Sequence, residues 1–373
     1  MQTHNTTPST NRPLFLRHLL ASRFVQTLSY PHGVDHYLES VNALWSLKEV
    51  RACVVATRQQ TPDTVTVTLR PNENWSGFAA GQYVRVAVDV DGVRHTRCFS
   101  PANSVHAADG CLELTCKIGP HSVVSRHFAA GSVGEVVRLS QAEGTFRLPK
   151  VRPERVLLIS GGSGITPVLA MLRTLLDEGF GGRITFLHYA KGAADQLYAA
   201  ELAQVAATHG NVQLLRCYAD GASGELEGLF SAAQLTSAVP DWASTQAFLC
   251  GPPGMMKVVE AAFDRAQVAD RLHVERFSAA PAESVVAADV AGEVRYARSE
   301  RVAENHGGSL LEQAEAAGLR PECGCRMGIC HSCTTRKLSG RVRDLRTGEV
   351  SGDGEEDIQI CVCAPVGTVA LDL

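Results

Sequence analysis

The sequence predicts three folded units in a row: an antiparallel β-barrel, a parallel α/β domain and a smaller mixed α and β domain. Three observations support this fold class. Residues 49–150 contain short strand-like segments, residues 151–278 alternate strands with helices, and residues 285–373 contain the cysteine-rich segment PECGCRMGICHSC. A chain of 373 residues is too long for one ordinary domain, and a hydrophobic content of 45% is sufficient for several cores.

The first 150 residues divide into an extension and a barrel. Residues 1–48 form an N-terminal extension, in which HYLESVNALWSL predicts a short helix that packs on the first unit or on a partner. In 49–150, the segments that alternate or are rich in β-branched residues are RACVVATRQ, TVTVTLRP, QYVRVAVDVDGVRHTRCFS, CLELTCKIG and GEVVRLSQ. The pair Asp91-Gly92 is typical of a two-residue hairpin turn. Strands at this spacing favour an antiparallel barrel.

Residues 151–278 have a different pattern. Short apolar runs (RVLLIS, RITFLHYA, VQLLRCYA and QAFLCG) are interspersed with helical segments such as PVLAMLRTLLDEG and MMKVVEAAFDRAQV. This alternation predicts a parallel sheet with helices on both faces. Residues 279–284, which are small and include a proline, are typical of a linker.

The third unit covers 285–373. SVVAADVAGEVRYARS predicts a hairpin, and TVALDL predicts a closing strand. SLLEQAEAAGL predicts a helix that starts with a capping box, Ser309 with Glu312, and stops at Gly318. The cysteine-rich segment follows that helix.

Composition excludes several function classes. The formal net charge is -4 and no basic block is present, which argues against binding of nucleic acid or of an anionic membrane surface. No stretch approaches eighteen apolar residues, so we expect no membrane span. The N-terminus lacks a charged-then-apolar signal pattern, so we expect a cytoplasmic protein. A membrane-bound partner would bring it to the membrane surface.

The cysteine spacing predicts an iron–sulfur cluster. Cys325, Cys330 and Cys333 follow the C-x4-C-x2-C spacing of plant-type [2Fe–2S] sites, whose fourth ligand comes from a distant position. Gly324 and Gly328 would let the loop turn tightly around the cluster. A structural zinc site is the alternative, but zinc ribbons prefer two C-x2-C pairs and this segment has one. Cys361 and Cys363 are the candidates for the fourth ligand.

Two glycine-containing turns predict a dinucleotide site. ISGGSGITPVLAML is a strand, a glycine loop and a helix, in which Thr166 is a plausible N-cap. Gly161, Gly162 and Gly164 would let a pyrophosphate approach the backbone at the positive end of that helix. Later in the chain, FLCGPPGMM places Cys250 at the carboxyl end of a parallel strand, the edge at which α/β sheets bind ligands.

The segment RCFS, residues 97–100, completes a recognisable set of motifs. In the order barrel, RCFS, GGSGITP and CGPP, the chain resembles the ferredoxin–NADP reductase superfamily from about residue 50 to 278. AGQYVRV (80–86) and EGTFRLP (143–149) add to this resemblance. With its C-terminal cysteine loop the chain is similar to three-domain reductases that supply oxygenases and desaturases. GCRMGICHSC and HYLESVNALWSLKEVRA most resemble the actinobacterial-type reductase of membrane acyl-CoA desaturases.

The resemblance implies roles for individual residues. Arg97 and Ser125 would contact the flavin phosphate, and Phe99, where the family has Tyr, would cover the flavin rings. Ser100 and Cys250 would flank the site of hydride transfer, with Gly251 and Pro252 beside the nucleotide and Phe277 shielding the flavin. A C-x3-P run in the family's ferredoxins favours Cys361 as the fourth ligand, in a β-grasp domain. Ser122 stands near the usual position of a Gly, which weakens the match just before Ser125.

The implied function is electron transfer from a nicotinamide through a flavin to the cluster and on to a protein acceptor. We expect FAD, with FMN as the alternative. We expect NADPH rather than NADH, because Lys191 follows the second parallel strand where NADH-binding proteins carry an acidic residue. A membrane di-iron fatty-acyl desaturase is the first candidate acceptor. A Rieske oxygenase, a cytochrome P450 or another hydroxylase is the second, and a redox sensor without turnover is a third hypothesis.

Overall fold

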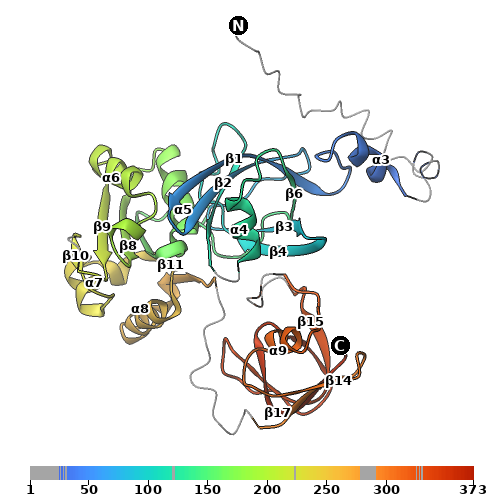
Figure 1. Cartoon of the computed structure of the whole chain (residues 1–373). Coiled ribbons are helices and arrows are strands. Elements are labelled where there is room, and N and C mark those ends of the chain that lie inside the picture. The colour runs from blue at the N-terminus through green and yellow to red at the C-terminus, as the bar shows by residue number, and fades with distance from the viewer. Residues whose placement is uncertain are drawn as a thin grey trace.

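The computed structural model describes residues 32–119, 122–221, 224–277, 291–324 and 331–373, together with 25, 27, 29, 326 and 328. The described part of the chain forms three sheets, which confirms the predicted fold class of barrel, parallel α/β domain and small mixed domain (Figure 1). None of its helices is long and apolar enough to cross a membrane.

The N-terminal helix α3 (Val34–Val41) begins and ends earlier than its segment suggests. The amide oxygen of Asn42 accepts a hydrogen bond from the backbone of Leu44 (2.9 Å), a local turn that diverts the chain from helical geometry. The carboxylate of Asp35 accepts from the backbone N–H of Leu47 (2.7 Å), and Arg51, on the first barrel strand, pairs with Glu39 (3.2 Å). These contacts fasten the described end of the extension to the barrel.

The barrel is a six-stranded antiparallel sheet in the order β4-β3-β6-β1-β2-β5. Its strands are β1 (Val50–Thr61), β2 (Thr64–Pro71), β3 (Val84–Val90), β4 (Val93–Phe99), β5 (Leu112–Lys117) and β6 (Val136–Leu139). Asp91 and Gly92 have φ values of 51° and 75°, which confirms the predicted turn between β3 and β4. The edges of the sheet meet where Pro101 bridges to Leu114 and the backbone N–H of Ala102 donates to the backbone carbonyl of Glu113 (2.7 Å). Helix α4 (Val123–Ala129), which the sequence analysis did not predict, packs on this sheet.

The second sheet is entirely parallel, in the order β10-β9-β8-β7-β11-β12. Its strands are β7 (Arg155–Gly161), β8 (Arg183–Ala190), β9 (Val212–Tyr218), β10 (Leu226–Glu227), β11 (Gln246–Cys250) and β12 (Leu272–Glu275). Helices α5 (Ile165–Asp177), α6 (Ala199–Thr208), α7 (Ala232–Ala238) and α8 (Pro253–Arg265) connect them. The strand order reverses between β7 and β11, and such a switch point opens a ligand crevice at the carboxyl ends of the strands.

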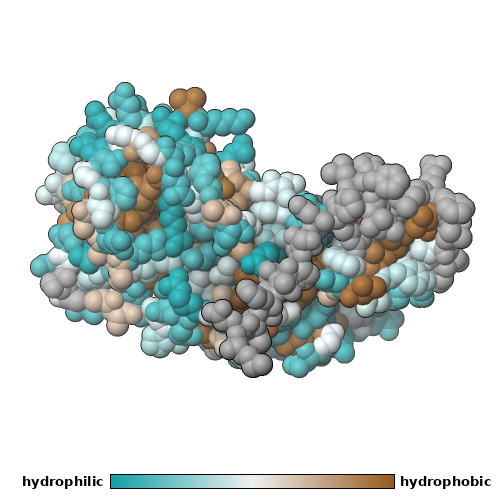
Figure 2. All heavy atoms as spheres, turned by 90° about the horizontal axis from the view of Figure 1, so that it is seen from above, coloured by the Kyte–Doolittle hydropathy of each residue, from teal (hydrophilic) through white to brown (hydrophobic). Residues whose placement is uncertain are grey.

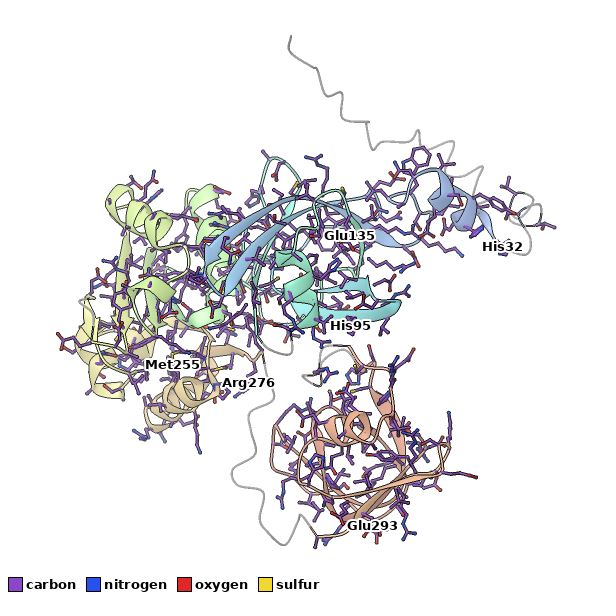
Figure 3. All side chains as sticks on the ribbon, in the orientation of Figure 1. His32, His95, Glu135, Met255, Arg276 and Glu293 are labelled. Carbon is purple, nitrogen blue, oxygen red and sulfur yellow. The ribbon has the colours of Figure 1, made fainter. Side chains whose placement is uncertain are left out.

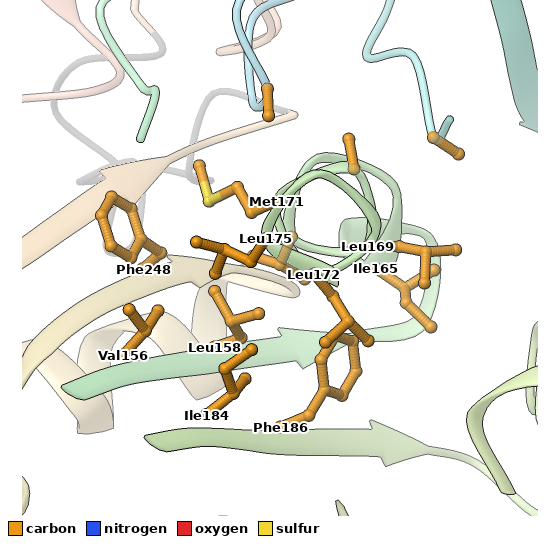
Figure 4. Packing of buried hydrophobic residues seen from close by; sticks show 14 of the residues in the cluster. Val156, Leu158, Ile165, Leu169, Met171, Leu172, Leu175, Ile184, Phe186 and Phe248 are labelled. Atoms are coloured by element: carbon orange, nitrogen blue, oxygen red, sulfur yellow. The ribbon is translucent and has the colours of Figure 1, made fainter. Parts of the chain in front are cut away.

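The barrel and the parallel sheet share one core. Buried residues of α5, among them Met171 and Leu175, pack on β7, β8 and β11, as Figure 4 shows. The same cluster includes Ala80, Ala102, Phe146 and Leu148, which belong to the barrel half of the chain. Burial of apolar surface therefore joins these two units directly.

The third sheet has the order β14-β13-β17-β15-β16. Its elements are β13 (Glu293–Tyr296), β14 (Arg301–Glu304), α9 (Leu310–Ala316), β15 (Thr334–Asp344), β16 (Glu356–Gln359) and β17 (Cys363–Leu371). Their hydrophobic core is separate from those of the other two sheets. The capping box of Ser309 and Glu312 is confirmed. The hairpin joins β13 to β14, so it lies further along the chain than predicted. Residues 285–290, at the start of the predicted hairpin segment, fall outside the described residues.

Candidate functional site

Two turns meet at the crevice of the parallel sheet. A Cβ atom on Gly164 would overlap the backbone carbonyl of Cys250, and one on Gly161 would lie 2.6 Å from Cδ of Pro252. Gly162 has a φ of 53°, which a residue with a side chain rarely adopts. The glycine loop and the CGPP turn can therefore touch only because these positions lack side chains, and together they leave backbone exposed to a ligand.

A cavity of about 660 Å³ opens over these turns. Several of the predicted cofactor-binding residues line it: Gly161, Gly162, Gly164, Lys191, Gly251, Pro252 and Phe277. Tyr189, Phe230 and Met255 add apolar walls, and Met255, labelled in Figure 3, lies in the first turn of α8. From the barrel side, Asp63 and Lys117 form an ion pair (3.1 Å) at its edge. A mostly apolar cleft with few charges fits a dinucleotide.

The start of α5 differs from the prediction. Thr166 is not its N-cap: the helix begins at Ile165 after a 3₁₀ turn (Gly162–Gly164), so Gly164 occupies the cap position. The hydroxyl of Thr166 instead donates to the carbonyl of Ser163 (3.4 Å). Because the tight turn already supplies helical geometry, no side-chain cap is needed, and the first N–H groups of α5 stay at the crevice.

Three polar groups converge where the barrel meets the crevice. The hydroxyl of Ser100, directly after β4, donates to Glu275 at the end of β12 (3.5 Å). Glu275 is paired in register with Cys250 on β11, and all three residues are buried. Burial raises the pKa of Glu275 to about 8 and, with the neighbouring Glu275, raises that of the Cys250 thiol well above its usual range. The structure thus brings together both predicted catalytic residues.

Glu275 was missed by the sequence analysis. It closes the short apolar strand LHVE at the carboxyl edge of the sheet, and an acidic residue at that position was the available signal. Its neighbours come from β4 and β11, so only the assembled sheet reveals the cluster.

The predicted flavin residues outside the cavity lining lie on the barrel. Arg97 and Phe99 are half-buried on β4, and Phe99 packs against the barrel core. Ser125 is buried on α4, which packs on β4. Because α4 contacts β4, the predicted flavin residues Arg97, Phe99 and Ser125 belong to adjacent elements of the barrel unit.

Arg97 also connects the barrel to the third unit. Its Nη1 donates to the carbonyl of Gly324 (3.2 Å), next to the predicted ligand Cys325, and to the carbonyl of Thr96 (2.7 Å). A second cavity of about 660 Å³ lies beside this contact, between β4 and the cysteine loop, with His95, Cys323 and Arg326 in its lining. Figure 3 shows His95 on the barrel side that faces the third unit.

The described part of the cysteine loop fits a buried cluster. Cys333 and Cys361 are buried, and the N–H of Ile360 donates to the carbonyl of Cys333 (3.4 Å), which places their backbones side by side. Gly328 has a φ of 72° and packs against Val362. Cys325 and Cys330 lie outside the described residues, so their roles stay predictions.

We predict that Glu275 makes the stability of the flavin and nucleotide unit depend on pH. Its pKa, about 8 when folded and 4.5 in a free chain, means that the folded state holds this proton longer. Stability should therefore fall as pH rises from 4.5 to 8. The decline in the free energy of unfolding should amount to a few kcal/mol, since each unit of pKa difference corresponds to about 1.4 kcal/mol. Glu275→Gln should remove this decline. Denaturant unfolding followed by flavin fluorescence measures it.

The exposed Glu227→Gln is the control for this comparison and should preserve the decline with pH. If Glu275→Gln also keeps the full decline, the buried carboxyl is not its source.

A second prediction separates Cys361 from Cys363. Cys361 lies in the turn beside Cys333, whereas Cys363 opens β17 and pairs with Asp344. Cys361→Ser should lose the visible absorbance of the cluster and most of its iron, and Cys363→Ser should retain both. Iron content per chain measures the difference, and the reverse pattern would assign Cys363 as the ligand.

The chain matches three protein-family models in succession. Residues 52–148 match the oxidoreductase FAD-binding domain, residues 158–261 the oxidoreductase NAD-binding domain and residues 294–366 the 2Fe-2S iron-sulfur cluster binding domain. These matches confirm FAD, NAD(P)H and [2Fe–2S] as the cofactor types.

Relatives match along most of the chain. An NADPH oxidoreductase of Mycobacterium tuberculosis is 36% identical over 344 residues, covering 91% of this chain and 88% of that protein. A glycine betaine monooxygenase reductase subunit of Chromohalobacter salexigens is 28% identical and covers 79% of this chain and 87% of its own length.

Solved structures share the fold. Phthalate dioxygenase reductase matches with a TM-score of 0.60 and 24% identity over 87% of this chain and 97% of that chain. A cytochrome P450 reductase of Amycolatopsis matches with a TM-score of 0.55 and 29% identity over 62% of this chain and 70% of its own. The chain is an oxidoreductase, and it belongs to the family of NAD(P)H reductases in which FAD- and NAD-binding domains of the ferredoxin–NADP reductase type are joined to a C-terminal [2Fe–2S] domain.

Proposed function

We propose that this protein takes electron pairs from NADPH and delivers single electrons to a separate oxygen-activating iron protein. The observation that carries the proposal is the continuity of the sites. The nucleotide cavity adjoins Gly164 and Cys250, Ser100 contacts Glu275 beside Cys250, and Arg97 on the same β4 segment contacts the cysteine loop. A nicotinamide releases two electrons together and a [2Fe–2S] cluster accepts one, and the flavin supplies the conversion between them.

Each group of residues has a proposed role in this path. Gly161, Gly162 and Gly164 bind the NADPH pyrophosphate, and Ser100 and Cys250 flank the position of hydride transfer. Glu275 holds a proton beside Ser100, because burial favours its neutral form. Arg97 and Ser125 hold the flavin phosphate, and Phe99 and Phe277 border its rings. Cys325, Cys330, Cys333 and Cys361 hold the cluster.

The choice of NADPH rests on Lys191. It directly follows β8, is exposed and lines the cavity. Asp195 also lines the cavity, but it lies further from the strand, as the last residue of a 3₁₀ turn (Ala193–Asp195). A lysine at the end of the second strand supports binding of a 2′-phosphate.

We favour an oxygenase as the acceptor. Several relatives are named as reductase components of oxygenase systems, including those of propane 2-monooxygenase and 3-ketosteroid-9-alpha-monooxygenase. A membrane fatty-acyl desaturase, the first choice from the sequence, is the second candidate, and it rests on the segments GCRMGICHSC and HYLESVNALWSLKEVRA alone. Both acceptors take single electrons at an iron centre, so the same reductase chemistry serves either one.

The test is an anaerobic titration of the purified holoprotein with NADPH, read by absorbance and low-temperature EPR. We expect the flavin to bleach and a spin one-half signal of a reduced [2Fe–2S] cluster to appear. Bleaching without the EPR signal would contradict transfer to the cluster. Oxidation of the reduced protein by a purified monooxygenase, compared with a desaturase in membranes, then identifies the acceptor class.

Lys191→Ala tests the nucleotide preference. Loss of a charged contact to the 2′-phosphate, worth about 1.5–3 kcal/mol, should lower kcat/KM for NADPH by about 10- to 100-fold. NADH, which lacks that phosphate, serves as the internal control and should change little. Lys191→Arg should keep the preference for NADPH. An equal loss with both nucleotides would exclude a 2′-phosphate contact.

A further inference from the structure

A partly buried arginine joins the flavin-binding and nucleotide-binding units at a distance from the cavity. Arg173, on α5, has a side chain that is only 16% exposed. Its Nε and Nη2 donate to the two carboxylate oxygens of Glu201 on α6, each at 2.6 Å. Its Nη1 crosses to the barrel, where it donates to the carbonyl of Ala102 (2.8 Å) and to Glu113 on β5 (2.9 Å).

Tyr198 makes a second connection at the same place. It directly precedes α6, is 5% exposed and has a φ of 57°, a conformation that costs energy for a residue with a side chain. Its hydroxyl donates to Glu113 (2.9 Å) and contacts the hydroxyl of Thr115. The guanidinium of Arg173 lies 5.0 Å from its ring centroid, within cation–π range. Burial raises the pKa of Tyr198, so the hydroxyl keeps the proton that it donates.

The two ends of this connection lead directly to the reacting groups. Ala102 lies two residues after Ser100, and its own N–H donates to the backbone carbonyl of Glu113 (2.7 Å). Helix α5, which carries Arg173, begins at the glycine loop of the nucleotide site. On the same helix, the hydroxyl of the next residue, Thr174, accepts from the N–H of Val105 (3.3 Å). The segment that positions Ser100 is therefore tied to the helix that positions the nucleotide.

We propose that Arg173 is a positioning residue for hydride transfer, with Tyr198 as its second support: together they fix the barrel and the parallel sheet at the orientation that the reaction requires. The inference rests on the proposed transfer from NADPH to FAD. That transfer moves a hydrogen with its electron pair from the nicotinamide to the flavin, leaving NADP⁺ and a two-electron-reduced flavin. Its rate depends steeply on the separation of the reacting atoms.

The experiment compares Arg173→Gln, Arg173→Lys and Tyr198→Phe in the FAD-loaded full chain. Stopped-flow reduction by NADPH yields the limiting rate and the Kd for NADPH separately. In Arg173→Gln we expect the limiting rate to fall about 10-fold or more, since a misplacement of about 1 Å costs up to about 100-fold. The Kd should change little, because the cavity residues are intact. Arg173→Lys should recover only part of the rate, since an ammonium cannot reproduce the forked contacts.

Arg216→Gln is the matched control. Arg216 is 30% exposed and also binds a carboxylate through two nitrogens, Nε and Nη2 to Glu225, but both partners belong to the nucleotide-binding unit. It should leave the limiting rate unchanged. Hydrogen–deuterium exchange adds a readout independent of turnover: the amides of Ala102 and Val105 should exchange faster in Arg173→Gln than in Arg216→Gln.

The outcomes separate the two proposals. A wild-type protein whose flavin is not reduced by NADPH would refute the proposed function. The wild-type flavin can be reduced by NADPH while Arg173→Gln keeps both its limiting rate and its amide protection. That result would refute the positioning role and leave the proposed function intact. If Arg173→Gln fails to bind FAD, Tyr198→Phe decides, because it retains the ring and removes only the hydroxyl contacts: an unchanged limiting rate there overturns the inference.

Discussion

The contact between the glycine loop and the CGPP turn is the constraint on which the site depends. Because no side chain fits between Gly164 and the carbonyl of Cys250, β7 and β11 can end side by side with only backbone between them. Two thirteen-residue helices, α5 and α8, begin directly at these turns, so both N-termini supply N–H groups and positive potential to one crevice. Any larger residue at Gly164 would separate the strands that define the site.

The contacts that the structure describes between the three units differ in kind. The barrel and the parallel sheet share a hydrophobic cluster and the hydrogen bonds of Arg173. Such a joint suits hydride transfer, because that reaction requires the reacting atoms to be held in near contact. The third unit has its own core, and within the described residues Arg97 donates a hydrogen bond to the carbonyl of Gly324 in that unit. Most of the surface in Figure 2 is hydrophilic, with apolar residues gathered in limited areas.

Local patterns predicted most of the fold. TVTVTLRP and RITFLHYA coincide with β2 and β8 because alternating or buried β-branched runs specify strands locally. The prediction that Thr166 caps α5 was wrong, because the preceding 3₁₀ turn replaces a side-chain cap. The acidic residue at the end of LHVE was the only sequence signal for Glu275, and its contact with Ser100 could not be predicted, since the two residues are 175 positions apart. Motifs therefore located the glycine turns and cysteines, whereas residues whose role arises from domain packing, such as Arg173, required the assembled structure.

The position of β12 in the chain has a consequence for biosynthesis. It is the last strand of the parallel sheet and carries Glu275, while the predicted cluster ligands begin at residue 325. A chain leaving the ribosome thus contains every residue proposed to bind the flavin or the nucleotide before the cysteine loop is made, and domains generally fold as units in that order. This order would allow FAD to bind to the growing chain, so that iron–sulfur insertion would act on a protein whose flavin half is already folded.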